Sequence, residues 1–256
     1  MPGNSKPVLE QQLPDGLLVD RTWLKASGFG RPAVDYYLRS GALVAVARGI
    51  YRRPGPPLKW QHVVYSLQEM GYGFHVGGQT ALEMQGMAHY LPVSGKSQIW
   101  LYGDGKMPAW VNRLEMSFNF QAGPTRLFGQ LPQAALTTLP FGHWDWPLDC
   151  SRPELALLEL LSVVKTADDF EPVDKIFESA ATLRPNVLMQ ILVACSQIKT
   201  KRLFMWLAER HGHAWFQKLD MEKIDLGSGK RMLVKGGRLV PKYQITVPRE
   251  MVDGSE

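Results

Sequence analysis

Arg31, Asp35 and Arg39 recur at every fourth position, and Tyr36 directly follows Asp35 in the sequence. Residues spaced by four share one face of a helix, so these side chains would form a single polar stripe. A guanidinium on such a stripe can donate to O6 and N7 of guanine, which makes Arg31 the strongest candidate for contacting a base. The alternative is a solvated helix face on which both arginines pair with Asp35.

Further polar groups flank this stripe on both sides. Arg48, Arg52 and Arg53 follow it around a predicted hairpin, whereas Lys25 and Ser27 precede it. Positive side chains and hydroxyls are the groups that commonly contact DNA phosphates. We therefore expect stripe, turn and hairpin to form one DNA-binding surface, with the hairpin arginines contacting phosphate or the minor groove.

A second basic segment lies near the end of the chain. Residues 199–249 hold twelve Lys/Arg against four Asp/Glu. This excess predicts either a solvated surface or a second nucleic-acid surface, and the residues concerned are Lys199, Lys201, Arg202, Lys230, Arg231, Lys235 and Arg238. Residues 227–230 read Gly-Ser-Gly-Lys, but a phosphate-binding loop would need Gly at 224 and Ser or Thr at 231, where the sequence has Ile and Arg.

Two short helices would carry the first surface. Asp20 is a suitable N-cap for a helix over 21–26, and a glycine-rich turn follows at 27–30. Pro32 suits the first turn of a second helix, in which Val34, Tyr37 and Leu38 share the apolar face and after which Gly41 favours termination. Helix, glycine turn and helix form a helix-turn-helix whose second helix would enter the major groove.

The period then changes from helical to extended. Residues 43–46 and 50–53 predict two strands joined by a turn at 47–49, which is the wing of a winged helix. Residues 54–57 read Pro-Gly-Pro-Pro and predict a linker. We therefore divide the chain into a DNA-binding domain over 1–58 and a larger domain over 59–256, with an alternative boundary near 90–95.

The larger domain is predicted to be mixed, which makes the whole chain α+β. Two strands are predicted at 98–102 and 114–120, and a capping box at 151–154 would begin a strongly apolar helix. A hairpin turning at 236–237 would end the chain. The remaining predicted helices cover 60–70, 79–87, 172–183, 185–197 and 201–211.

Composition restricts the class of protein further. The net charge of +5 is uneven, because residues 1–60 hold nine Lys/Arg against four Asp/Glu and residues 61–198 hold eight against thirteen. Cys150 and Cys195 are too few for a disulfide framework or a zinc site, and no motif for nucleophilic catalysis occurs. We expect no enzymatic activity, metal or cofactor, no membrane span and a cytoplasmic location.

Four segments resemble one family. Residues 38–54 are similar to the N-terminal winged helix of the AbiEi antitoxins of bacterial type IV toxin-antitoxin systems. Residues 77–86, 151–161 and 199–211 resemble the C-terminal region of that family. The order of these segments along the chain carries the assignment.

The resemblance implies a function that the residue pattern alone does not give. It implies an autorepressor that binds inverted repeats in its own promoter, together with a C-terminal region that opposes an AbiEii-type nucleotidyltransferase toxin without a stable complex. The alternative is a protein-interaction module that binds and inhibits a partner toxin directly.

Overall fold

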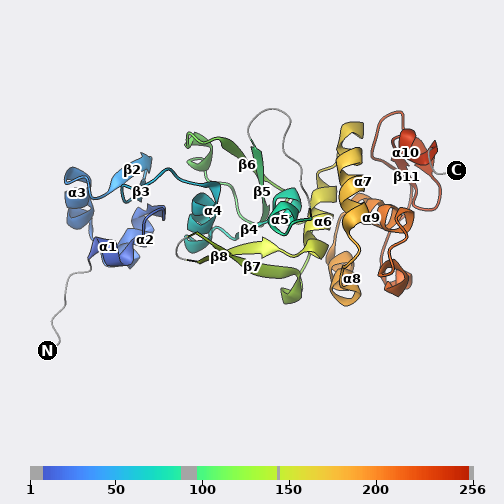
Figure 1. The fold of residues 1–256 in the computed structure, drawn as a ribbon, viewed down its shortest axis with the longest axis horizontal. Coiled ribbons are helices and arrows are strands. Elements are labelled where there is room, and N and C mark those ends of the chain that lie inside the picture. The colour runs from blue at the N-terminus through green and yellow to red at the C-terminus, as the bar shows by residue number, and fades with distance from the viewer. Residues whose placement is uncertain (1–7, 88–96, 143–144, 254–256) are drawn as a thin grey trace.

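In the computed structural model, which describes residues 8–87, 97–142 and 145–253, the elements follow one another along an elongated molecule (Figure 1). The N-terminal helices and hairpin lie at one end, a mixed sheet lies in the middle, and the later helices lie at the other end. The fold is α+β, with a small winged helix-turn-helix followed by a larger mixed part, as the sequence predicts.

The winged helix forms where the local signals predict it. Asp20 accepts a hydrogen bond from the N–H of Trp23 at 2.7 Å and caps the first of the two helices, and Gly28 adopts a φ of +88° in the turn that follows. The elements are α1 (Leu9–Gln12), β1 (Val19–Asp20), α2 (Arg21–Ala26), α3 (Arg31–Arg39), β2 (Val44–Ala47) and β3 (Ile50–Arg52).

Two of these elements are not predicted by the sequence pattern, namely α1 and β1. β1 pairs antiparallel with β3, with Val19 opposite Tyr51, so the strand order is β1-β3-β2. The elements enclose a small apolar core to which Trp146 of the larger part also contributes. Its buried members are Leu9, Leu13, Leu17, Val19, Leu24, Phe29, Val34, Leu43, Tyr51 and Trp146.

A five-stranded mixed sheet forms the middle of the molecule, in the order β6-β5-β4-β8-β7. β4 pairs in parallel with β8, β5 pairs in parallel with β6, and the other two pairs are antiparallel. The strands are β4 (Phe74–Val76), β5 (Ser97–Gly103), β6 (Phe118–Ala122), β7 (Leu136–Phe141) and β8 (Trp146–Ser151). Two helices, α4 (Trp60–Glu69) and α5 (Gly78–Met84), pack against this sheet.

Two local predictions in this part are wrong. The strand predicted from residue 114 begins at Phe118, because residues 114–117, which follow a 3-10 turn at 111–113, form bends and coil instead. The capping box predicted at 151–154 does not form, since Ser151 ends β8 and donates its hydroxyl proton to Glu159 at 2.7 Å. Glu154 is bound by Arg184, so neither polar side chain is available to cap the helix.

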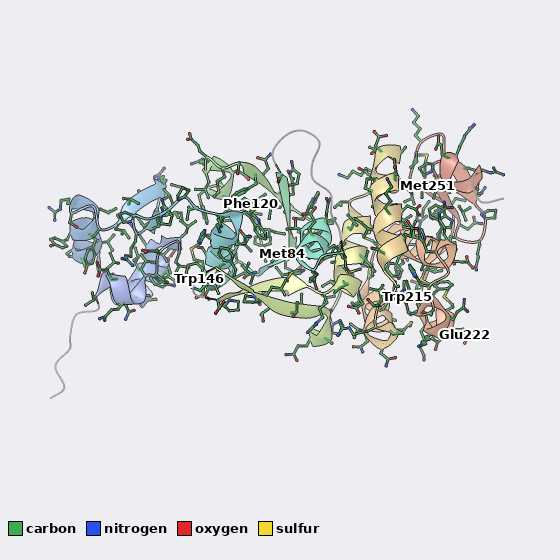
Figure 2. All side chains as sticks on the ribbon, viewed as in Figure 1. Met84, Phe120, Trp146, Trp215, Glu222 and Met251 are labelled. Carbon is green, nitrogen blue, oxygen red and sulfur yellow. The ribbon has the colours of Figure 1, made fainter. Side chains whose placement is uncertain are left out.

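Four helices build the far end of the molecule. They are α6 (Pro153–Ser162), α7 (Phe170–Ser179), α8 (Pro185–Ala194) and α9 (Ile198–Arg210), followed by single 3-10 turns at Phe216–Lys218 and Met221–Lys223. Every residue of α6 is buried except Pro153, which explains why its sequence is apolar on all faces. Trp206 and Trp215 lie in this core, and the indole N–H of Trp215, which is labelled in Figure 2, donates to the carbonyl of Ala180 at 2.7 Å.

The last segment differs from the predicted hairpin. Its strands are β9 (Arg231–Met232), β10 (Arg238–Val240) and β11 (Ile245–Val247), and a short helix, α10 (Glu250–Asp253), follows. β10 and β11 form the antiparallel pair, so the chain reverses over residues 241–244 and not at 236–237. β9 pairs in parallel with the other edge of β11. A local hairpin pattern cannot predict this pair.

The winged helix packs directly on the larger part. Trp146, labelled in Figure 2, stacks on Tyr65 of α4 with ring centroids 4.6 Å apart and also joins the winged-helix core. Residues 54–57 form the coil that joins β3 to α4. The division at residue 58 stays a prediction, and the alternative boundary near 90–95 lies outside the described residues.

Candidate nucleic-acid interface

The stripe predicted from sequence lies on the outer face of α3. The Arg31 side chain is 83% exposed, and Tyr36 and Arg39 are also exposed, whereas Val34 on the opposite face is buried. Asp35 lies between the two arginines, with its carboxylate 3.8 Å from Nε of Arg31 and its carbonyl accepting from Nε of Arg39 at 3.2 Å. The face therefore presents two guanidinium groups and an exposed phenol on one helix.

Arg21 is a member of this surface that sequence reasoning missed. Its Nε donates to the hydroxyl of Tyr51 at 2.9 Å, and its guanidinium lies 3.9 Å from Asp35. The hydrogen bond from Arg21 to Tyr51 raises the pKa of the arginine, so the group stays charged. The local sequence showed only that Arg21 is the first residue of the helix that Asp20 caps. Its partner Tyr51 comes from β3, so no local pattern could predict their contact.

The predicted turn residues lie beside the start of α3. Lys25 is exposed in the last turn of α2, and Ser27 is the half-buried C-cap of that helix. The N–H of Phe29 donates to the carbonyl of Leu24 at 2.8 Å, which closes the turn and buries the phenyl ring. Lys25 is thus accessible to a phosphate, while Ser27 is less so.

The wing carries one arginine that is free to bind. Arg48 is exposed in the turn between β2 and β3, next to Gly49 with its φ of +80°. The register shifts between Ala45 and Ala47, and such a bulge bends the strand that leads to the tip. Among the described residues, Arg48 makes no hydrogen bond or ion pair that would hold it to the protein.

The other two wing arginines contact other parts of the protein, and their DNA contact stays a prediction. Arg52 donates to the carbonyl of Pro56 at 2.9 Å, and so bridges the linker. Arg53 lies 3.0 Å from Asp15 and donates to the carbonyl of Leu13 at 3.3 Å. Both guanidinium groups therefore fix the segments that flank the winged helix.

The basic C-terminal set is divided by the structure. Lys201 and Arg202 are only 3% and 2% exposed, so the prediction that they form a nucleic-acid surface is wrong. Arg202 donates to the carbonyls of Leu226, Gly227 and Gly229 at 2.6, 3.0 and 2.6 Å. The Gly-Ser-Gly-Lys loop thus directs carbonyl oxygens at a guanidinium, which is the opposite polarity from a phosphate cradle.

The rest of that set is accessible. Lys230, Arg231, Lys235 and Arg238 are exposed, and Lys199 is half-buried. Three of the four exposed residues lie on or next to the short strands β9 and β10. They form a smaller basic surface than the sequence predicts.

Groups that could do other chemistry have structural partners. Burial, with the charges of Glu159 and Asp149, raises the pKa of the Cys150 thiol to about 12, and burial also raises that of Cys195. His211 lies 2.8 Å from Asp174, whereas His213 bonds the carbonyl of Phe177. Within residues 8–87, 97–142 and 145–253 no group of three His, Cys, Asp or Glu is placed to hold a metal ion.

Two further results bear on the class of protein. No helix among the described residues is long and apolar enough to cross a membrane. A winged helix with exposed arginines on α3, carried by a larger mixed domain, is the architecture of a transcriptional regulator.

Comparison with known families places the chain within that class. Residues 4–93 match the family described as "Transcriptional regulator, AbiEi antitoxin N-terminal domain", and residues 96–248 match "Transcriptional regulator, AbiEi antitoxin, Type IV TA system". The chain therefore belongs to the AbiEi antitoxin family of type IV toxin-antitoxin systems, as the four resembling segments predict.

A solved structure has the same fold. The crystal structure of the RV2827C protein from Mycobacterium tuberculosis aligns with a TM-score of 0.54 at 19% sequence identity, over 90% of this chain and 86% of that chain. At this identity the likeness concerns the fold. No curated protein matches the sequence.

Proposed function

We propose that this protein represses its own promoter by binding inverted repeats through the winged helix, and that it opposes an AbiEii-type nucleotidyltransferase toxin. The family supports the regulatory and antitoxin roles in general. The observation that carries the DNA-binding role is the outer face of α3, where Arg31 extends into solvent beside Tyr36 and Arg39.

The groove contact would come from the start of α3. Arg31 is the first residue of that helix, and the N-terminal residues of a recognition helix are those that meet base edges. A bidentate contact from Arg31 to guanine is worth ~1–3 kcal/mol of discrimination, or roughly 5- to 150-fold in affinity. Tyr36 and Arg39, later in the helix, would contact the backbone or a neighbouring base.

Phosphate contacts would come from the flanking cations. Arg48 at the wing tip and Lys25 at the end of α2 are exposed, and Arg21 presents a guanidinium that is already held in place by Tyr51. An ordered guanidinium loses little conformational freedom when it binds a phosphate. Because Arg52 and Arg53 are bound within the protein, we assign the phosphate role to Arg48, Lys25 and Arg21.

Opposition to the toxin is assigned to the larger part. This part carries the later helices and both further sheets, and the groove and wing contacts proposed above do not involve it. The family supports the antitoxin role, and the nucleotidyltransferase partner follows from the resemblance alone. A direct toxin-binding module stays the alternative, and a stable complex of the two purified proteins would favour it.

The exposed basic residues on and around β9 and β10 are a second proposed nucleic-acid surface. Lys230, Arg231 and Lys235 would contact flanking DNA or an RNA substrate of the toxin through phosphates. Reversal of these three to Glu should weaken protection against the toxin if the surface is functional. Protection that is unchanged in the folded variant would show a solvated surface.

The test of DNA binding compares three variants of the full chain. Anisotropy titrations with promoter and random duplexes are run over a range of salt concentrations for Arg31→Ala, Arg48→Ala and Lys218→Ala, the last of which removes an exposed charge on a distant 3-10 turn. The Arg31→Ala protein should lose its preference for the promoter duplex. The Arg48→Ala protein should bind both duplexes more weakly, and the slope of log affinity against log salt concentration should fall in magnitude by ~1. Equal effects of all three variants would contradict the assignment.

A further inference from the structure

Strand β6 lies beside β5 at one edge of the central sheet, and no other described strand pairs with it (Figure 1). The N–H of Gly123, which directly follows β6, donates to the carbonyl of Leu101 in β5 at 2.8 Å. Backbone groups along a strand point alternately to its two sides, so those of Gln121 and Asn119 face β5 as well. The residues whose N–H and C=O groups face the open edge are Phe118, Phe120 and Ala122.

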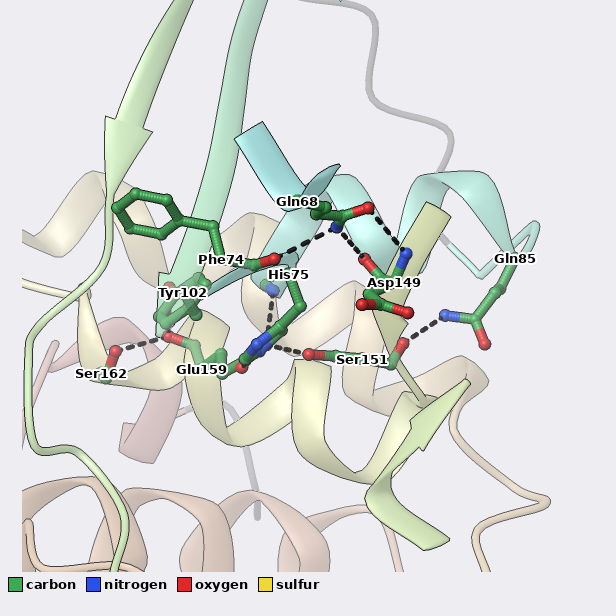
Figure 3. Close-up of polar contacts among 10 residues, drawn as sticks. Gln68, Phe74, His75, Gln85, Tyr102, Asp149, Ser151, Glu159 and Ser162 are labelled. Carbon is green, nitrogen blue, oxygen red and sulfur yellow. Dashed lines mark hydrogen bonds and ion pairs between the residues drawn. The ribbon is translucent and has the colours of Figure 1, made fainter. Parts of the chain in front are cut away.

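Unpaired backbone groups elsewhere in this sheet are bonded by side chains. Gln68 lies where β4 and β8 are not paired, and its amide nitrogen donates to the carbonyls of Phe74 and Asp149, both at 3.1 Å (Figure 3). Gln85 likewise donates to the carbonyl of Ser151 at 2.9 Å. Within residues 8–87, 97–142 and 145–253, no side chain bonds the outer side of β6 in this way. These backbone groups are therefore open to a strand from another molecule.

A hollow of about 360 Å³ lies along this edge. Four consecutive residues of β6, residues 118–121, line it, although their side chains alternate between the two faces of the sheet. A hollow that contacts all four lies beside the backbone edge and not over one face. Its other wall is built by Val111, Asn112, Leu114 and Met116. An extended chain segment fits this slot, because it places one strand beside β6 with no second sheet behind it.

The sequence of β6 lacks the features that protect a strand edge. Residues 116–123 contain no charged side chain and no proline. Edge strands usually carry lysine, proline or inward-pointing charges, which prevent pairing with another chain. Strand β7, at the opposite edge of the sheet, contains Pro140. The edge of β6 is thus the one of the two whose composition favours the addition of a strand.

A second hollow, of about 570 Å³, continues the first and reaches the wing. The two hollows share Leu114, Met116 and Phe118. Val46 of β2 lines the second hollow, together with two cations, Arg52 and Arg113, and one carboxylate, that of Glu115. A bound segment that entered it would contact the winged helix and the larger part at the same time.

The polar groups of the second hollow favour an acidic side chain. Arg113 is exposed and makes no hydrogen bond or ion pair with any residue that the structure describes. Nε of Arg52 is buried and has no acceptor in the described part of the chain. Buried donors of this kind are rare, and a carboxylate from a bound segment would supply the acceptor. Arginine keeps its charge at any ordinary pH, so two guanidinium groups oppose one carboxylate here.

We propose that the edge of β6 binds an extended segment of a protein partner, which adds a strand to the central sheet and places an acidic side chain beside Arg52 and Arg113. Backbone hydrogen bonds to Phe118, Phe120 and Ala122 supply the affinity, and the second hollow supplies the selectivity. This interaction goes beyond the proposed repressor function and does not depend on DNA binding.

The test selects peptides that bind the full chain from a displayed library of random decapeptides. Affinities of the selected peptides are measured by fluorescence anisotropy against Ala122→Pro, which removes an outward N–H at an exposed edge position where proline is tolerated. Ala122→Val is the matched control, because it keeps the N–H. Ala122→Pro should weaken binding about tenfold, and Ala122→Val should bind as the unaltered protein does.

A second measurement leaves the protein unaltered and so does not depend on how the variants fold. Methylation of alternate peptide nitrogens removes the N–H groups on one side of the bound strand. One alternate set should abolish binding, and the other set should leave it unchanged. Arg113→Ala should weaken peptides that carry an acidic residue about 3- to 10-fold, whereas Lys218→Ala should have no effect.

Three results would overturn the proposal. They are a selection that yields no saturable binder, equal affinities for Ala122→Pro and Ala122→Val, and equal effects of the two methylated sets. Sedimentation velocity of the protein without peptide tests the other occupant of this edge. A dimer that Ala122→Pro dissociates would assign the edge to a second copy of this chain and also contradict the proposal.

Discussion

The backbone N–H of Leu18 donates a hydrogen bond at 2.8 Å to the hydroxyl of Ser66, across the junction between the winged helix and α4. Ser66 donates its own proton to the carbonyl of His62 at 2.6 Å. Both Leu18 and Ser66 are 0% exposed, so no water can replace this bond if it is lost. It couples the two parts of the molecule independently of the linker at 54–57.

Ser66→Ala should therefore destabilise the whole chain. The substitution leaves the buried N–H of Leu18 without an acceptor, which costs about 1–3 kcal/mol. Urea unfolding should show this loss, and hydrogen exchange at the Leu18 amide should be faster. Ser40→Ala is the control, because Ser40 makes a similar bond to a backbone carbonyl on the exposed surface and should cost much less. Equal losses would show that the junction bond is unimportant.

Features encoded by neighbouring residues were predictable from the sequence. The Asp20 cap, the glycine at 28 and the proline at 32 each act within one turn, so α2, the turn and α3 could be placed from the sequence alone. The hairpin could be predicted because the hydrophobic periodicity changes from helical to extended after Gly41. β1 could not be predicted in this way, because a strand of two residues shows no period.

Features that depend on distant residues could not be predicted. The orientation of Arg53 is set by Asp15, and the burial of Arg202 is set by a loop that begins 24 residues later. The roles of Glu154 and Glu159 depend on partners 30 and 84 positions away, so the apolar helix that carries them gave no sign of either. Net charge along the chain therefore overstated the accessible basic surface.

Asp35→Ala should raise the affinity for DNA and reduce its selectivity. The Asp35 carboxylate lies 3.8 Å from Arg31 and 3.9 Å from Arg21, so it restrains both and repels phosphates. Its removal should tighten binding to promoter and random duplexes by about 2- to 10-fold at low salt, with the larger gain for random DNA. Asp35→Asn tests the charge alone. Weaker binding of both variants would show that Asp35 itself contacts a base.

Arg184→Ala should destabilise the fold strongly, because it removes the guanidinium that pairs with the buried Glu154 carboxylate and leaves only the backbone N–H bond. Arg184 donates to Glu154 from its backbone N–H at 2.8 Å and from two side-chain nitrogens at 2.9 Å, and the Glu154 side chain is only 3% exposed. Breaking such a pair costs about 3 kcal/mol or more. The double variant Glu154→Gln with Arg184→Ala should recover part of the loss, and a double-mutant cycle by urea unfolding measures the coupling.

The same pair predicts a pH dependence. Burial opposes ionisation of Glu154, but the hydrogen bonds from Arg184 outweigh it, so the pKa of this carboxyl is lowered. A lowered pKa gives stability that is present above the unfolded pKa of roughly 4.3 and is lost as the pH falls through the folded value. The stability gap between the unaltered protein and Glu154→Gln should therefore narrow below about pH 4. A gap that widens on acidification would contradict this assignment.

Arg202→Met should loosen the C-terminal segment and leave the winged helix intact. Arg202 is buried and bonds four carbonyls, those of Leu226, Gly227, Gly229 and Gln244, so its removal frees the loop before β9 and the turn before β11. The loss should be about 3 kcal/mol, with faster hydrogen exchange over residues 226–247 and unchanged exchange in α2 and α3. Lys201→Met is the matched control, since it removes a neighbouring buried charge that makes no hydrogen bond among the described residues. If Arg202→Met kept full stability but bound nucleic acid more weakly, Arg202 would be a surface contact after all, and the clamp that we describe would be wrong.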